Sequence, residues 1–152
     1  MIRVQAEPFD VGAELAALSA GRTDIGAVAS FVGLVRDHAG ERAIGAMTLE
    51  HYPGMTEKKL AEVEAEAHAR WPLQASLIVH RYGRMLPGEP IVLVATASSH
   101  RAAALEACAF LIDWLKTQAP FWKLEEGSDS ARWVEARAAD EDAAERWRRG
   151  SA

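Results

Sequence analysis

The chain has 152 residues, of which 49% are hydrophobic and 26% charged, a composition typical of one globular domain with a hydrophobic core. Its formal net charge of −5 argues against nucleic-acid binding, and no apolar run approaches the roughly 20 residues of a membrane helix. The single cysteine, Cys108, excludes an internal disulfide and a zinc site built on paired cysteines, and we expect no metal. From the length we expect one domain over residues 1–152.

The first half of the chain predicts short strands and one helix. β-Branched and apolar runs predict strands at residues 2–6, 25–35 and 44–52. The run at 25–35 is apolar throughout and indicates a buried strand. Asp10 can cap a helix over residues 11–20, and the polar residues 36–43 predict a loop. The start of the chain carries no apolar signal-peptide core, so we expect a cytoplasmic protein.

Two longer helices are predicted further along the chain. Thr56 can cap the first, which reaches about Trp71, and Ser98 or Ser99 can cap the second, which ends near Gln118. The second helix is expected to bury a face formed by Leu105, Cys108, Leu111, Ile112 and Leu115.

The remaining segments predict hairpins and a terminal helix. Residues 74–83 and 90–98 flank the turn LPGEP and predict one hairpin, and residues 121–126 and 131–136 predict a second pair of strands. Residues 139–149 predict a charged helix. Hairpins interspersed with three to four helices favour an α+β fold with an antiparallel or mixed sheet over a doubly wound parallel sheet.

Basic side chains at three places are candidates for binding an anion. Arg36 follows a predicted strand, where functional groups often lie, and a solvated loop arginine is the alternative. His100 and Arg101 begin a helix, whose free N–H groups favour an anion, and two exposed polar side chains are the alternative. Arg137 precedes an acidic run, so a surface ion pair is the simpler interpretation.

Two lysines bracket the helix break at Pro120. Lys116 falls in the last turn of a helix, where a cation is favoured in any case. Lys123 follows Phe121 and Trp122, and an ammonium among aromatic groups and near other cations loses its proton more easily than one in water. That chemistry suits an acid–base or nucleophilic lysine, whereas a strand lysine that lies over aromatic rings is the structural alternative.

Several stretches of this sequence, taken in order, resemble the large, catalytic subunit of molybdopterin synthase. They are GAVASFVGLVRDH (26–38), LEHYPGMTEK (49–58), VHRYGRMLPGE (79–89), SSHRAAALEACAFLIDWLKTQAPFWK (98–123) and RWVEAR (132–137). Each motif is weak alone, but five collinear motifs that cover nearly the whole chain are specific.

The resemblance implies a fold, a reaction and two partners. The fold of this family is an α/β hammerhead, and its enzymes are homodimers with one small ubiquitin-like sulfur-carrier subunit at each outer end, a 2+2 heterotetramer. The carrier brings a C-terminal thiocarboxylate. Two sulfurs are added in turn to cyclic pyranopterin monophosphate to give molybdopterin, and no cofactor stays permanently bound.

The resemblance also implies roles for single residues. Lys116 and Lys123 match the family's catalytic candidates, Phe31 its pocket phenylalanine, and Arg137 an arginine lent to the neighbouring subunit's site. The matched substrate contacts are Leu34, Val35, Arg36, His100, Arg101, Lys116, Lys123, Leu124 and Glu125. Relatives often carry a basic residue at Leu124, so a contact there is expected to come from the backbone.

The length of the second long helix predicts a site shared by two chains. If that helix is unbroken, Arg101 and Lys116 are separated by about 22 Å, too far for one small substrate to touch both. We therefore expect His100, Arg101 and Arg137 from one subunit to meet Arg36, Lys116 and Lys123 from the other.

Two rival functions differ in what they ask of single residues. A cysteine-dependent sulfurtransferase would use Cys108, but a cysteine on the apolar face of a helix is usually an inert small hydrophobe. A non-catalytic adaptor for a ubiquitin-like carrier would leave Lys116 and Lys123 without a chemical task.

Overall fold

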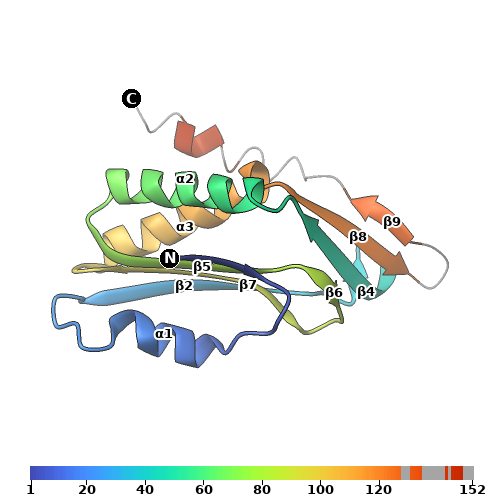
Figure 1. Cartoon of the computed structure of the whole chain (residues 1–152), viewed down its shortest axis with the longest axis horizontal. Coiled ribbons are helices and arrows are strands. Elements are labelled where there is room, and N and C mark those ends of the chain that lie inside the picture. The colour runs from blue at the N-terminus through green and yellow to red at the C-terminus, as the bar shows by residue number, and fades with distance from the viewer. Residues whose placement is uncertain (128–130, 135–142, 144, 149–152) are drawn as a thin grey trace.

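The chain folds into two sheets that meet end to end, with helices on both faces of the first (Figure 1). The structure is a computed structural model that describes residues 1–127, 131–134, 143 and 145–148. α2 and α3 lie over one face of the first sheet, and α1 lies over the other (Figure 1). This arrangement confirms the predicted α+β fold with a mixed sheet. The assignment of residues 1–152 to one domain stays a prediction.

The helices and strands follow one another closely along the chain. The helices are α1 (Val11–Ser19), α2 (Met55–Arg70) and α3 (Arg101–Gln118). The strands are β1 (Ile2–Gln5), β2 (Ala27–Leu34), β3 (His38–Ala39), β4 (Arg42–His51), β5 (Leu73–Arg81), β6 (Gly83–Met85), β7 (Pro90–Ser98), β8 (Phe121–Gly127) and β9 (Ala131–Val134).

The first sheet has the order β1-β5-β7-β2, and only its β1–β5 pair is parallel. The second sheet has the order β3-β4-β8-β9, with β6 also paired to β4. The predicted hairpin of 74–83 and 90–98 is confirmed as the β5–β7 pair. Its connection is more than a turn, however, because the chain crosses to the second sheet as β6 before it returns.

Apolar side chains form a separate cluster on each packed surface. The largest cluster lies between the first sheet and α2 and α3, and includes Leu60, Ile78 and Phe110, all almost fully buried. A second cluster lies under α1. The third belongs mainly to the second sheet and consists of Val35, Met47, Leu49 and Met85, hereafter the Val35 cluster. This third cluster underlies the candidate site.

Helix capping is confirmed at one predicted position and wrong at two. The Asp10 carboxylate accepts a hydrogen bond from the Ala13 N–H, as expected of an N-cap. Gly54, not Thr56, stands at the N-cap of α2. Its backbone φ of +84° is one that glycine adopts readily. His100, not Ser98 or Ser99, stands at the N-cap of α3. The serine hydroxyls instead donate to distant backbone carbonyls, those of Pro72 and Asp24.

Three predictions of burial or loop structure are also wrong. β2 is not buried throughout, because it is the edge strand of its sheet, and Val28 is 41% exposed. Residues 36–43 contain β3 and the start of β4, which pair with each other. Leu105 does not belong to the inner face of α3: it is 60% exposed, whereas Cys108, Leu111 and Leu115 are buried as predicted.

The C-terminal predictions are confirmed as far as the structure describes them. β8 and β9 form the expected antiparallel pair up to Val134. Residues 143 and 145–148 are helical, and Trp147 packs against the largest cluster, while the rest of 139–149 lies outside the described residues. In the described ranges, no helix is both long and apolar enough to cross a membrane.

Thr56 is expected to link α2 to the start of β8, because its buried hydroxyl accepts from the Tyr52 N–H and donates to the Pro120 carbonyl. Thr56→Val should lower the free energy of unfolding by about 1–3 kcal/mol, since both backbone groups lose their partner. Urea denaturation measures this change. Thr117→Val is the matched control, because the Thr117 hydroxyl bonds only to carbonyls of its own helix. Equal losses in the two variants would contradict the link.

Candidate active site

The two candidate lysines lie on either side of the junction between α3 and β8. Lys116 is exposed in the last turn of α3, and β8 begins after Pro120. β8 pairs with β4 so that Lys123 stands opposite Leu49 and Glu125 opposite Met47. Directly paired residues share a face of a sheet. Lys123 therefore lies on the face that carries the Val35 cluster.

Arg36 reaches the same region from the end of β2. The pairing of β2 with β7 shifts register between Gly33 and Leu34, and the strand ends there. Val35, the next residue, is buried in the Val35 cluster, and Arg36 follows it in an exposed position. Arg36 and Lys123 thus border one cluster, although they lie far apart in the sequence.

Buried His80 is a member of this region that the sequence analysis missed. Its ring stacks on Phe121, the first residue of β8, with centroids 3.7 Å apart and planes 17° from parallel. Its Nδ1 donates to the Arg81 carbonyl at 2.9 Å, because a carbonyl can only accept. The His51 and Tyr82 rings lie nearby, with centroids 4.3 Å apart. Only the apolar run before His80 hinted that it would be buried.

Burial is the main cause that lowers the pKa of His80, to about 4. The bond to the Arg81 carbonyl opposes this effect, and the charges of Lys116 and His51 add to it. The charge of Lys116 therefore acts on the ring that anchors β8. Both candidate lysines are thus tied to one short segment, from the end of α3 to the middle of β8.

Leu124 and Glu125 differ in the direction of their side chains. Leu124 pairs with Thr48 on the face of the second sheet opposite Lys123, whereas Glu125 shares the face of Lys123. The Glu125 carbonyl accepts a hydrogen bond from Arg42. A contact from Leu124 to a ligand held by Lys123 would therefore come from the backbone, in line with the prediction for that position.

Among the other predicted residues, His100 and Arg101 lie apart from Lys116, at the opposite end of α3. His100 and Arg101 are exposed at the start of α3, next to the beginning of β2, where the Gly26 N–H donates to Ser98. Because α3 is unbroken, about 22 Å separates Arg101 from Lys116. Phe31 and Leu34 are 37% and 53% exposed on β2. Arg137 lies outside the described residues, so its predicted role is untested.

Comparison with known proteins identifies the family. The family model described as MoaE protein matches residues 4–118. The molybdopterin synthase catalytic subunit of Pseudomonas aeruginosa is 58% identical over 146 residues, which cover 96% of this chain and 97% of that protein. The chain belongs to the MoaE family, the catalytic subunits of molybdopterin synthase. The resemblance drawn from the five motifs is confirmed, and with it the expectation of an enzyme of molybdenum cofactor biosynthesis.

Solved structures agree with this assignment. The MoaE protein of Burkholderia ambifaria superposes with a TM-score of 0.83 at 54% identity, over 97% of each chain. A Helicobacter pylori structure, a complex of subunits 1 and 2 of molybdopterin-converting factor, matches 90% of this chain and 91% of its own with a TM-score of 0.74. The two chains are 22% identical, so this superposition shows a shared fold and no more.

Cys108 is poorly placed for sulfur chemistry in this MoaE-family chain. The thiol is buried on the inner face of α3, with Sγ 3.9 Å from the Val94 carbonyl oxygen. Burial raises the pKa of the Cys108 thiol to about 11, so the reactive thiolate is disfavoured at neutral pH. The geometry supports the interpretation of Cys108 as an inert core residue.

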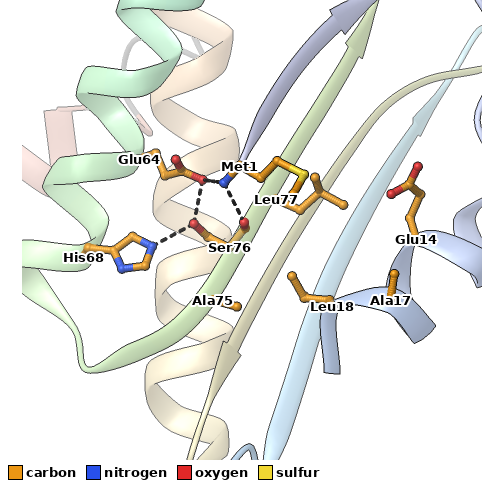
Figure 2. Close-up of a pocket in the computed structure, with 9 residues that line it drawn as sticks. All are labelled: Met1, Glu14, Ala17, Leu18, Glu64, His68, Ala75, Ser76 and Leu77. Atoms are coloured by element: carbon orange, nitrogen blue, oxygen red, sulfur yellow. Dashed lines mark hydrogen bonds and ion pairs between the residues drawn. The ribbon is translucent and has the colours of Figure 1, made fainter. Parts of the chain in front are cut away.

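A pocket of about 520 Å³ lies elsewhere, between α1, α2 and β5 (Figure 2). Four of its lining residues bond to one another: the Met1 ammonium and the Ser76 hydroxyl both donate to Glu64, and His68 bonds to the same hydroxyl (Figure 2). The predicted site residues are not among those that line it. This pocket is therefore separate from the candidate active site of the MoaE family.

The low pKa of His80 predicts an acid-sensitive fold. Between pH 6.5 and 4, His80 binds a proton in the unfolded chain but stays neutral in the folded one. The free energy of unfolding therefore decreases as the pH falls through this window, by up to about 3 kcal/mol. His80→Phe keeps a ring against Phe121 and removes this titration. Urea unfolding from pH 8 to pH 4 should show a shallower decline for the variant. Parallel curves for the two proteins would contradict the prediction.

Proposed function

We propose that the chain transfers sulfur from the C-terminal thiocarboxylate of a small ubiquitin-like carrier to cyclic pyranopterin monophosphate, which yields molybdopterin. The observation that carries the proposal is the β4–β8 register. It turns Lys123 toward the Val35 cluster, which Arg36 also borders, and Lys116 is close enough for its charge to act on His80 beneath β8.

The cations in this arrangement suit an anionic substrate with a reactive ring. Arg36 would pair with the cyclic phosphate, and His100 and Arg101 at the N-terminus of α3 would add a helix dipole and two donors to the same group. Lys116 and Lys123 would face the carbon atoms that receive sulfur. Leu34, Val35, Leu124 and Glu125 would bound the substrate from β2 and β8, and Phe31 would contribute an apolar wall.

The chemical step needs cations more than it needs a nucleophile from this chain. The thiocarboxylate sulfur attacks a substrate carbon and forms the new C–S bond as a C–O bond at that carbon breaks, and the departing oxygen takes a proton from an ammonium group of the site. Water then breaks the acyl–sulfur bond, which leaves a carboxylate on the carrier, and a second carrier repeats the step. Negative charge develops on oxygen in both stages, and the two ammonium groups can stabilise it or donate a proton. The sulfur comes from the partner, which agrees with the buried state of Cys108.

A second protein must supply that sulfur. The Pseudomonas aeruginosa relative is named as a catalytic subunit, and the Helicobacter pylori protein with this fold forms a complex of two subunits. By this analogy we infer that the chain binds a small carrier subunit whose tail enters the site. The cytoplasmic location and the absence of a permanently bound cofactor stay predictions.

We further propose that two copies of the chain pair through β2, which would make the centre of a 2+2 heterotetramer. In the described part of the chain, β2 pairs on one side alone, with β7, and its outer edge is open to a further strand. Val28, Phe31 and Leu34 are exposed on this strand, and Leu105 is exposed on the helix that packs over it.

An antiparallel pair of β2 strands would complete the site. Each β2 begins beside the start of α3, where His100 and Arg101 lie, and ends next to Arg36. A two-fold axis beside the open edge of β2, level with the middle of the strand, would bring the start of β2 in one copy against the end of β2 in the other. The anion-binding groups of one copy would then join Arg36, Lys116 and Lys123 of its partner. Arg137 is proposed to cross the interface in the same direction.

Reconstitution tests the reaction. The purified chain, mixed with a thiocarboxylated ubiquitin-like carrier and cyclic pyranopterin monophosphate, should form dithiolene product, assayed after oxidation to its fluorescent derivative. Lys116→Ala should lower the rate by about 10²-fold or more, as loss of a proton donor or charge stabiliser does. Cys108→Ala should retain the rate. If neither the wild type nor Lys116→Ala formed product, with the carrier shown to be loaded and bound, the non-catalytic adaptor function would be the better account.

Mixing two inactive variants tests the shared site. Arg101→Ala and Lys116→Ala should each be inactive alone. A refolded or co-expressed equal mixture should recover about one quarter of the wild-type rate, because half of the dimers carry one intact site of two. Arg36→Ala with Lys116→Ala is the matched control and should give no more than the mean rate of the two variants measured alone, since both residues would come from one chain and each site of a mixed dimer would carry one of the two changes. No recovery in the first mixture, with mixed dimers demonstrated, would place all these groups in one subunit.

A further inference from the structure

A tight turn at residues 86–89 contacts the backbone just before Arg36. A 3.1 Å backbone bond joins its first and last residues, and Gly88 has a φ of +90°, which suits glycine. The turn holds Val35 at two points. The Val35 N–H donates to the Glu89 carbonyl at 3.0 Å, and the Gly88 N–H donates to the Val35 carbonyl at 2.7 Å.

The Glu89 carboxylate stabilises this turn from two directions. One oxygen accepts a hydrogen bond from the Leu86 N–H at 2.5 Å, and the other lies 3.4 Å from Arg81. The Leu86 N–H, and after it Arg81, lower the pKa of the Glu89 carboxyl. Glu89 is therefore charged at neutral pH.

Arg81 anchors the carboxylate to the first sheet. Its side chain is almost fully buried at the end of β5, and its guanidinium also donates to the carbonyls of Ala6 at 3.1 Å and Pro90 at 3.2 Å. These bonds attach it to the chain after β1 and to the start of β7. A buried guanidinium needs a counter-charge, and Glu89 supplies it.

We propose that Arg81 and Glu89 are positioning residues that hold Arg36 in place through the backbone of Val35. The inference rests on the proposed function, in which Arg36 binds the phosphate of the substrate. β2 ends at Leu34, so pairing with β7 no longer restrains the chain at Val35. The two backbone hydrogen bonds from the turn restrain Val35 instead, and Arg36 is the residue that follows it.

Kinetics of Glu89→Gln in the reconstituted enzyme tests the proposal. The amide that replaces the carboxylate has one oxygen instead of two, so it can accept from Arg81 or from the Leu86 N–H but not from both, and one bond to the turn is lost. KM for cyclic pyranopterin monophosphate should rise about tenfold, the coupling usual within one hydrogen-bond network, with kcat within about twofold. Glu66→Gln breaks the Arg70–Glu66 pair on α2 and should leave both constants unchanged.

A double-mutant cycle separates this inference from a general loss of structure. In an Arg36→Ala background, Glu89→Gln should raise KM by no more than about twofold further, because there is no arginine left to misplace. Additive losses would overturn the inference and leave the proposed function intact. If Arg36→Ala itself left KM unchanged, the substrate contact of the proposed function would fall, and the inference with it.

Amide hydrogen exchange gives a readout that does not depend on activity. In Glu89→Gln the Val35 amide should exchange at least about tenfold faster, whereas the Leu93 amide in the middle of β7 should keep its rate. Arg81→Lys, which keeps the charge and loses the fork of donors, should show the same pattern more weakly. Equal acceleration at both amides would indicate global loosening and overturn the positioning role.

Discussion

The antiparallel pairing of β4 with β8 is the contact on which the candidate site depends. Side chains alternate between the two faces of a sheet, so a slip of one residue would turn Lys123 away from the Val35 cluster and Leu124 toward it. Two contacts at the start of β8 oppose such a slip. The Phe121 ring is stacked on buried His80, and the Pro120 carbonyl accepts a hydrogen bond from buried Thr56.

The same region joins the two sheets. The chain leaves the first sheet after β5, runs beside β4 as β6, and returns through the 86–89 turn to β7. Arg81 is buried at this crossing, where its guanidinium donates to the backbone carbonyls of Ala6 and Pro90. The cost of burying its charge is offset by Glu89, and the loops on either side become well enough held to carry functional groups.

α3 imposes a second constraint. It is a continuous helix with cationic residues at both ends, and its length keeps Arg101 and Lys116 about 22 Å apart. A helix buried along one face by Cys108, Leu111 and Leu115 cannot bend to bring them together. In the proposed dimer, a second copy related by two-fold symmetry would bring Arg101 of one chain near Lys116 of the other without a change in the fold. The open edge and exposed apolar residues of β2 offer a surface for that copy.

The sequence by itself determined the α+β class, most strand and helix positions, and the family, because periodicity and five collinear motifs are local signals. It also indicated that Arg36, Lys116 and Lys123 act together, though only through resemblance. The tertiary structure decided what no local pattern carries: that Lys123 and Leu124 face opposite ways, that His80 is buried under β8, and that Gly54 rather than Thr56 caps α2. Strand register, burial and long-range hydrogen bonds depend on which distant segments meet, and that is a property of the folded chain.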